Sequence, residues 1–171
     1  PGKYVRSFRV NFNHWAGWNF GGERMVLGGN VNAHWVFQNF WAMGSGFNVN
    51  GRGFDDRATR GGPGANTTAP IGQWLYVTTN DRKRVSFYWN SFWNNDFNGS
   101  RFVEIAPGVT IRPKPDVMLS LGARWTNNKD DAQWIENLDE DTPRPAYVFG
   151  RLKQTTAAAT LRLNYTLRPN L

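Results

Sequence analysis

Apolar and polar residues alternate along most of the chain, and this period of two predicts β-strands. In residues 157–171, Leu161, Leu163, Tyr165 and Leu167 alternate with threonine, arginine and asparagine. Successive side chains of a strand point to opposite faces, so this segment has one apolar and one polar face. An amphipathic helix would need an apolar stripe with a period of 3.6 residues, and no such stripe extends over a dozen residues. The sequence therefore predicts an all-β protein.

The same alternation recurs in further segments that end in turn residues. The predicted strands are residues 7–13, 30–38, 41–50, 74–79, 85–93, 102–112, 117–126 and 157–171. Strands of about ten residues suffice to cross a bilayer when they are tilted. We expect an antiparallel up-and-down sheet of about 8 to 10 strands, forming part or all of an outer-membrane-type β-barrel. Residues 1–171 are expected to form a single domain, as a fragment of a longer barrel.

Long and short links alternate between the predicted strands. Residues 51–73 and 127–146 form long links and 94–100 a medium one, whereas 80–84 and 112–116 are short. Outer-membrane barrels have tight turns at one end and longer loops at the other, so the alternation favours this architecture over a Greek-key sandwich. In the second long link, part of the chain (133–138) is expected to extend a strand beyond the membrane before it returns through 147–153. Residues 168–170 have the composition of a closing turn, after which a further strand is expected.

The alternation also divides the side chains into two predicted sets. The residues expected to face lipid or a protein partner are Phe8, Val10, Phe12, Trp35, Phe37, Val109, Ile111, Leu119, Leu121, Leu161, Leu163 and Leu167. The residues expected to line a lumen are Arg9, His34, Glu104, Arg112, Arg124, Arg162 and Asn164. In an open, water-filled lumen the excess of arginine favours small anionic solutes. In a plugged lumen the same arginines would be ion-paired and nothing would pass, and the sequence leaves both arrangements open.

The tryptophans add a second indication of a membrane. Trp41, Trp74, Trp93 and Trp125 lie at or near predicted strand ends, where an aromatic girdle contacts the lipid headgroups. The alternative is that they are core tryptophans of a soluble β-domain.

Composition excludes several classes. A mean hydropathy of −0.58 and the lack of an apolar run near twenty residues exclude a transmembrane helix. The net charge of +7 suggests nucleic acid, but the basic residues are scattered and only Arg82, Lys83 and Arg84 form a run, which favours a solvated surface or a polar lumen. The absence of cysteine rules out disulfides and thiolate metal sites. The sequence begins at Pro1 without signal-peptide features, so we expect a mature product or a fragment.

Three segments resemble a known family. They are GFDDRATRGGP (53–63), YVFGRLKQTT (147–156) and RLNYTLRPNL (162–171). They are similar to the C-terminal outer-membrane β-barrel domain of unknown function that is found in large bacterial proteins behind a family-nine carbohydrate-binding module. The resemblance runs from about Asn30 to Leu171 and implies an outer-membrane barrel whose chain continues into further strands. It carries over no catalytic residue, and because the carbohydrate-binding module is missing it transfers no glycan role.

The sequence contains no convincing catalytic, cofactor or metal site, and we expect a protein that is not an enzyme. His14 and His34 lack the spacing of a metal or acid–base motif, and GxSxG does not occur. The acid pairs at 55–56 and 130–131 could hold calcium through oxygen ligands, but they lack EF-hand spacing and have basic neighbours. Residues 139–141 (Asp-Glu-Asp) are expected at a solvated loop tip.

The leading functional hypothesis is a non-enzymatic barrel in the bacterial outer membrane, acting as a pore, a transporter element or an anchor for an exported module. An alternative is an accessory β-sheet subunit that docks its apolar face onto a larger membrane-protein assembly, at the periplasmic face of the membrane complex. A second alternative is a soluble oligonucleotide-binding barrel, although most of the aromatic residues are expected to share a face with leucine and valine rather than with arginine. The expected partners are thus the bilayer or a membrane-protein complex, and not nucleic acid.

Overall fold

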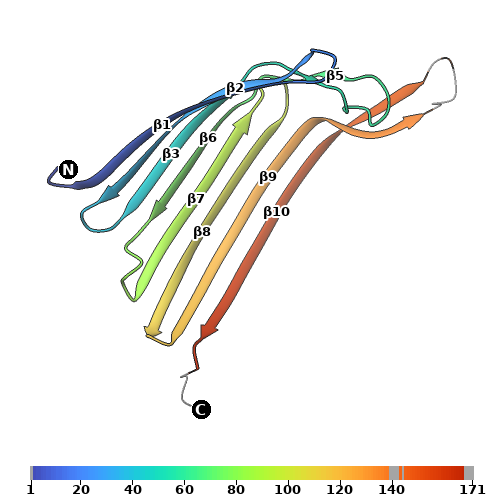
Figure 1. The fold of residues 1–171 in the computed structure, drawn as a ribbon. Helices are drawn as coiled ribbons and strands as arrows, with labels where there is room; N and C mark the ends of the chain where they lie inside the picture. The colour runs from blue at the N-terminus through green and yellow to red at the C-terminus, as the bar shows by residue number, and fades with distance from the viewer. Residues whose placement is uncertain (1, 139–142, 144, 168–171) are drawn as a thin grey trace.

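The fold was taken from a computed structural model, which describes residues 2–138, 143 and 145–167. An antiparallel sheet of eight strands dominates it, in the order β1-β2-β3-β6-β7-β8-β9-β10. Each strand therefore pairs with the next one of the sheet along the chain, as Figure 1 shows. The strands of this sheet are β1 (Val5–Trp18), β2 (Arg24–Phe37), β3 (Ala42–Asn50), β6 (Ile71–Thr78), β7 (Val85–Asn95), β8 (Arg101–Lys114), β9 (Val117–Leu138) and β10 (Ala146–Tyr165). The predicted all-β class and the antiparallel up-and-down order are confirmed.

The long link between β3 and β6 contains a small second sheet. Its strands are β4 (Phe54–Asp55) and β5 (Ala65–Asn66), which pair with each other. Strands of two residues carry no periodic pattern, so the sequence did not predict them.

The two ends of the sheet differ less than predicted. The links 38–41, 79–84 and 115–116 lie at one end and are short, whereas the long link 51–70 lies at the other end together with the links 19–23 and 96–100, which are no longer than 79–84. We call the first the short-turn end and the second the loop end. The turn expected at 168–170 lies outside the described residues.

The prediction of a loop that begins at residue 127 is wrong. β9 continues to Leu138 and stays paired with β10 as far as Ala146, with register shifts near Phe149 and Gly150. The polar run Asn127–Asp131 hid this extension, because it lacks the apolar alternation from which the strands were predicted. The predicted extension through residues 133–138 is confirmed, and it begins earlier than expected.

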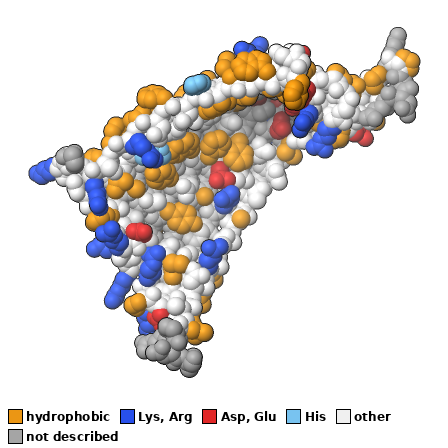
Figure 2. Space-filling view, viewed as in Figure 1, with side chains coloured by type: hydrophobic (Ala, Val, Ile, Leu, Met, Phe, Trp, Pro, Cys, Tyr) orange, Lys and Arg blue, Asp and Glu red, His pale blue; other side chains and the backbone are white. Residues whose placement is uncertain are grey.

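The sheet forms one curved layer without a hydrophobic core. Among the described residues, Ala106 is the one hydrophobic residue that is buried. The sheet curves into a trough, whose hollowed face is in view in Figure 2. No second layer covers either face of this part of the chain, so each face must meet a surrounding medium or a partner.

Both edges of the sheet are open. β1 pairs with β2 alone and β10 with β9 alone, and β1 does not pair with β10. The outer backbone groups of these two strands have no ladder partner in the sheet, so the described strands form an open wall and not a closed barrel.

Candidate functional site

The register of the strands shows which side chains share a face, and it places most polar side chains of the sheet on the concave face. One row of paired residues runs Asn13, Asn30, Asn48 and Gly72, and continues through Asn94, Phe102 and Asn128. The amides bond to one another: Asn13 Nδ2 donates to Asn30 Oδ1 at 2.8 Å, and Asn32 Nδ2 donates to the same oxygen at 2.8 Å. The buried strand residues Gly44, Gly46, Gly72, Ser86 and Ala106 share this face. Crowding on one side of a curved sheet identifies that side as concave.

Glycines on this face are covered by aromatic rings from the neighbouring strand. The Trp74 indole lies over Gly46 and the Tyr76 ring over Gly44, so that a Cβ at Gly44 would come within 2.5 Å of Tyr76 Cε1. The two rings are parallel to within 2°, with centroids 5.9 Å apart. Each ring thus fills the space that a side chain would need, as in the aromatic cover of strand glycines used to shape curved sheets.

His34 lies beside the rings of Trp74 and Tyr76, and we call these three residues the aromatic floor. Its Nδ1 lies 3.2 Å from the Tyr76 hydroxyl, and its ring centroid is 5.5 Å from that of Trp74. In the same way Trp15 lies over Gly28 and donates from Nε1 to Asn50 Oδ1 at 3.1 Å. The histidine predicted to line the lumen therefore has a hydrogen-bonding role among aromatic rings.

One prediction about aromatic residues is wrong. Trp74 belongs to the concave face, and not to a girdle on the apolar face, because it alternates with Leu75. Most aromatic residues of the strands share the convex face with leucine and valine, as expected, but the concave face also carries Trp15, Trp74, Tyr76, Tyr88, Phe92 and Phe102. The topology nevertheless differs from the five-stranded Greek-key barrel of an oligonucleotide-binding fold.

The predicted lumen residues share the concave face by register. Arg9 pairs with His34, Arg162 with Ser120, and Asn164 with Met118. Glu104 and Arg124 are brought together, with Glu104 Oε2 lying 3.4 Å from Arg124 Nη1.

Arg112 is different from the rest of this set. Its Nη1 donates to the carbonyl oxygen of Asp81 at 2.9 Å, which ties its guanidinium to the turn between β6 and β7. It therefore lies at the rim of the short-turn end.

The predicted apolar set occupies the opposite, convex face. Leu121 pairs with both Val109 and Leu161, and Leu119 with both Ile111 and Leu163. At the other edge Phe8 packs on Trp35, with ring centroids 5.2 Å apart. The remaining members are Val10, Phe12, Phe37 and Leu167; the first three lie on β1 and β2, and Leu167 follows β10.

Large apolar side chains of this face are exposed. The exposed fraction is 80% for Phe12, 58% for Phe87, 50% for Leu121 and 72% for Leu161. A contiguous apolar surface of this extent is unusual for a water-exposed face.

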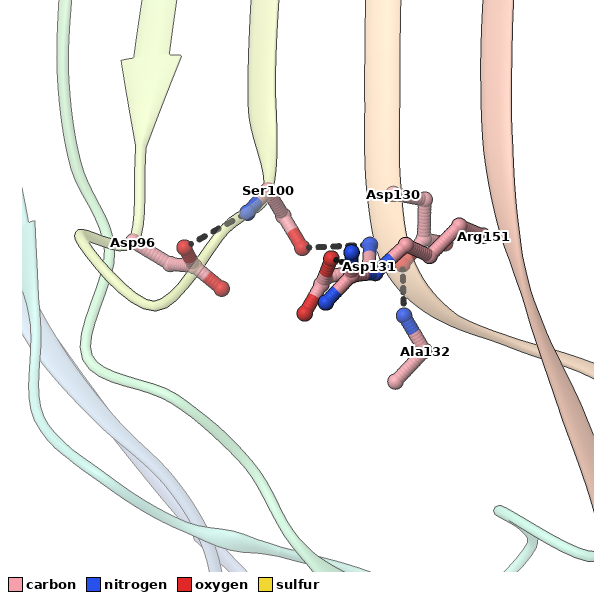
Figure 3. Close-up of polar contacts among 6 residues, drawn as sticks. All are labelled: Asp96, Ser100, Asp130, Asp131, Ala132 and Arg151. Atoms are coloured by element: carbon pink, nitrogen blue, oxygen red, sulfur yellow. Dashed lines mark hydrogen bonds and ion pairs between the residues drawn. The ribbon is translucent and has the colours of Figure 1, made fainter.

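A polar cluster at the loop end joins the β7–β8 turn to β9 and β10 (Figure 3). The Asp96 carboxylate accepts from the backbone N–H groups of Asn98 at 2.8 Å and Ser100 at 2.9 Å. Burial raises the pKa of Asp96, but these N–H groups and the hydroxyls of Thr68 and Ser100 more than offset this effect, so its pKa lies below the ordinary 3.8. This carboxylate orders the turn between β7 and β8.

Both residues of the acid pair at 130–131 make hydrogen bonds or ion pairs within the same cluster. Asp131 Oδ1 lies 2.7 Å from Arg151 Nε, and the Asp131 N–H donates to Ser100 Oγ at 3.1 Å. Asp130 accepts from the N–H of Ala132 at 3.1 Å. In the described part of the chain, no three His, Cys, Asp or Glu side chains come together as a metal-ligand set.

The long link docks onto the extended β9–β10 hairpin. The Arg60 guanidinium lies over the Trp134 ring, 4.4 Å from its centroid, and Asn137 Nδ2 donates to the Thr59 carbonyl oxygen at 2.8 Å. Gly62 packs against the Tyr147 ring. The link therefore crosses the loop end from β3 to the far side of the sheet (Figure 1). Sequence reasoning placed this link outside the sheet and missed its anchors.

Comparison with family models, with curated proteins and with solved structures finds no match to this chain. No helix in the described residues is long and apolar enough to cross a membrane. The functional argument therefore rests on the two faces of the sheet and on its ends.

Proposed function

We propose that this chain forms a wall of a non-enzymatic β-barrel in the bacterial outer membrane, with the convex face toward lipid and the concave face toward water. The observation that carries the proposal is the exposed apolar convex face opposite a concave face of amides, hydroxyls and arginines. A lipid-facing band with a polar interior is the pattern of outer-membrane barrels. In water the same convex face would be an aggregation surface.

Strand length agrees with this function. At about 3.3 Å per residue, the nine residues of β3 span about 30 Å. A strand tilted by about 40° therefore covers a height close to the apolar band of about 25 Å of such barrels. The longer β9 and β10 extend past this height at the loop end.

The open edges support a second candidate function. Unpaired backbone groups are not tolerated in lipid, so β1 and β10 need further strands on their outer sides. If a different membrane protein supplies these strands, the chain is an accessory subunit of that assembly. Purification of the chain with a stoichiometric partner, and its loss of fold on separation, would favour this candidate.

The experiment is vesicle flotation. The purified chain is refolded in the presence of phosphatidylcholine vesicles, washed with alkaline carbonate and with urea, and centrifuged through a sucrose gradient. We expect it to float with the vesicles after both washes. Recovery as a soluble, folded monomer in the absence of lipid and detergent would refute the proposal.

A further inference from the structure

A polar depression lies on the concave face over β7 to β10. Its volume is about 630 Å³, enough for a small solute, and it is open to the hollow of the trough. The residues that determine its chemistry are Tyr88, Ser120, Arg124, Thr160, Arg162 and Glu104. Neither the strand pattern nor the resemblance assigns a role to this depression as a unit.

Register brings its hydrogen-bond donors together. Ser120, Gly122 and Arg124 follow one another on the concave face of β9, and Thr160 and Arg162 of β10 pair with Gly122 and Ser120. The Tyr88 ring extends from β7 across β8, so that its hydroxyl would lie 2.6 Å from a Cβ placed at Gly122. Glycine at this position therefore leaves room for the tyrosine hydroxyl between the side chains of β9.

The charges of the depression do not balance. Arg124 is paired with Glu104 at 3.4 Å, whereas none of the ion pairs among the described residues involves Arg162. Arginine keeps its proton at all physiological pH values, so the depression has a net charge of about +1. A guanidinium that has no ion-pair partner in the described part of the chain and lies beside hydroxyl groups is suited to a carboxylate, phosphate or sulfate group, which accepts hydrogen bonds from both.

We infer that this depression binds a small solute through an oxyanion group, held by Arg162 and by the hydroxyls of Tyr88, Ser120 and Thr160. Glu104 limits the affinity, because it neutralises Arg124 and repels the anion. For the proposed barrel, this site selects solutes that carry an oxyanion group. The inference rests on the proposed function in one respect, which is that water must reach the concave face.

The experiment is isothermal titration of the folded chain, in the lipid or detergent in which it is folded, with inorganic phosphate as the probe and choline chloride added to hold the ionic strength constant. We expect saturable binding that Arg162→Gln weakens by about 10-fold or more, as expected for the loss of a charge-assisted hydrogen bond. Arg162→Lys should retain part of the affinity, because it keeps the charge but not the planar fork. Glu104→Gln should tighten binding several-fold. Arg9→Gln, on the same face but at the opposite edge of the sheet, is the matched control and should leave the affinity unchanged.

The outcomes separate the site from the membrane proposal. Absence of saturable phosphate binding, or equal binding by the wild type and Arg162→Gln, overturns the site whether or not the chain floats with vesicles. A tighter Glu104→Gln variant supports the site independently of Arg162, because a variant that merely unfolds cannot gain affinity. If the chain does not float with vesicles but binds phosphate through Arg162, the barrel proposal is overturned and the binding site is retained.

Discussion

Replacing one convex-face leucine by arginine tests which medium this face contacts. Leu121 lies in the centre of the apolar stretch of β9 and pairs with Val109 and Leu161. Its side chain is 50% exposed, so in water the substitution removes little packing and should cost at most about 0.5 kcal/mol. An arginine at the midplane of a bilayer costs about 2–4 kcal/mol. The expected loss for Leu121→Arg is therefore about 2–4 kcal/mol.

Thr126→Arg on the same strand is the matched control. Thr126 lies on the concave face and pairs with Glu104, whose carboxylate can accept the new guanidinium. We expect a change within about 0.5 kcal/mol. Both variants are unfolded by urea from phosphatidylcholine vesicles, and the free energy of unfolding is extrapolated to water with an unchanged slope. A cost below about 0.5 kcal/mol for Leu121→Arg, or equal costs for both variants, would refute the assignment of the convex face to lipid.

Three further predictions concern the curvature and the loop end. Gly46→Ala places a methyl group against the indole that covers it and should destabilise the fold by about 1–3 kcal/mol in urea unfolding, whereas Gly51→Ala, whose nearest neighbouring atom lies 3.6 Å away, should be tolerated. The pKa of Asp96 is lower in the folded than in the unfolded chain, so its contribution to stability is complete above pH 3.8 and is lost as the pH falls through the lower folded value. The hydrogen-exchange protection factors of the β7–β8 turn should therefore fall below pH 3.8 in the wild type and be low already at neutral pH in Asp96→Ala. Arg60→Ala removes the cation–π contact with Trp134, worth about 0.5–1 kcal/mol, and should increase proteolysis of the link 51–70 while leaving the sheet intact.

Each of these predictions has a result that contradicts it. Equal stability of the two glycine variants would show that the indole moves aside without cost. Slow exchange in the turn of Asp96→Ala would show that the backbone alone orders it. If proteolysis of the link is unchanged in Arg60→Ala, the hydrogen bond from Asn137 is enough to hold the link in place.

The faces of the strands were predictable because the alternation of side chains is a local property. Residues such as Leu119, Leu121 and Arg124 lie on the predicted faces, since a continuous strand fixes every second side chain to one side. The predicted strands were shorter than the observed ones, as in β1, where the expected segment ends at residue 13 and the strand continues to Trp18. The pattern was lost there because the concave face itself carries an aromatic residue, Trp15.

The contacts between strands were not predictable, because they depend on register. The cover of Gly46 by Trp74 requires β3 and β6 to be aligned as they are, and no single segment contains this information. The ion pair between Asp131 and Arg151 depends in addition on the register shifts of β10. Consequently the sequence predicted two faces, but neither the aromatic floor nor the polar cluster of the loop end.

The exposure of alternate residues of β9 to lipid and to water tests the central claim most directly. The chain contains no cysteine, so a single cysteine at each position from 117 to 126 can carry a spin label without background. In phosphatidylcholine vesicles, collisions with oxygen report contact with lipid and collisions with a water-soluble nickel chelate report contact with water. We predict oxygen maxima at Val117, Leu119, Leu121, Ala123 and Trp125, with nickel maxima at the residues between them. Nickel access at every position, or the absence of a period of two, would contradict the account.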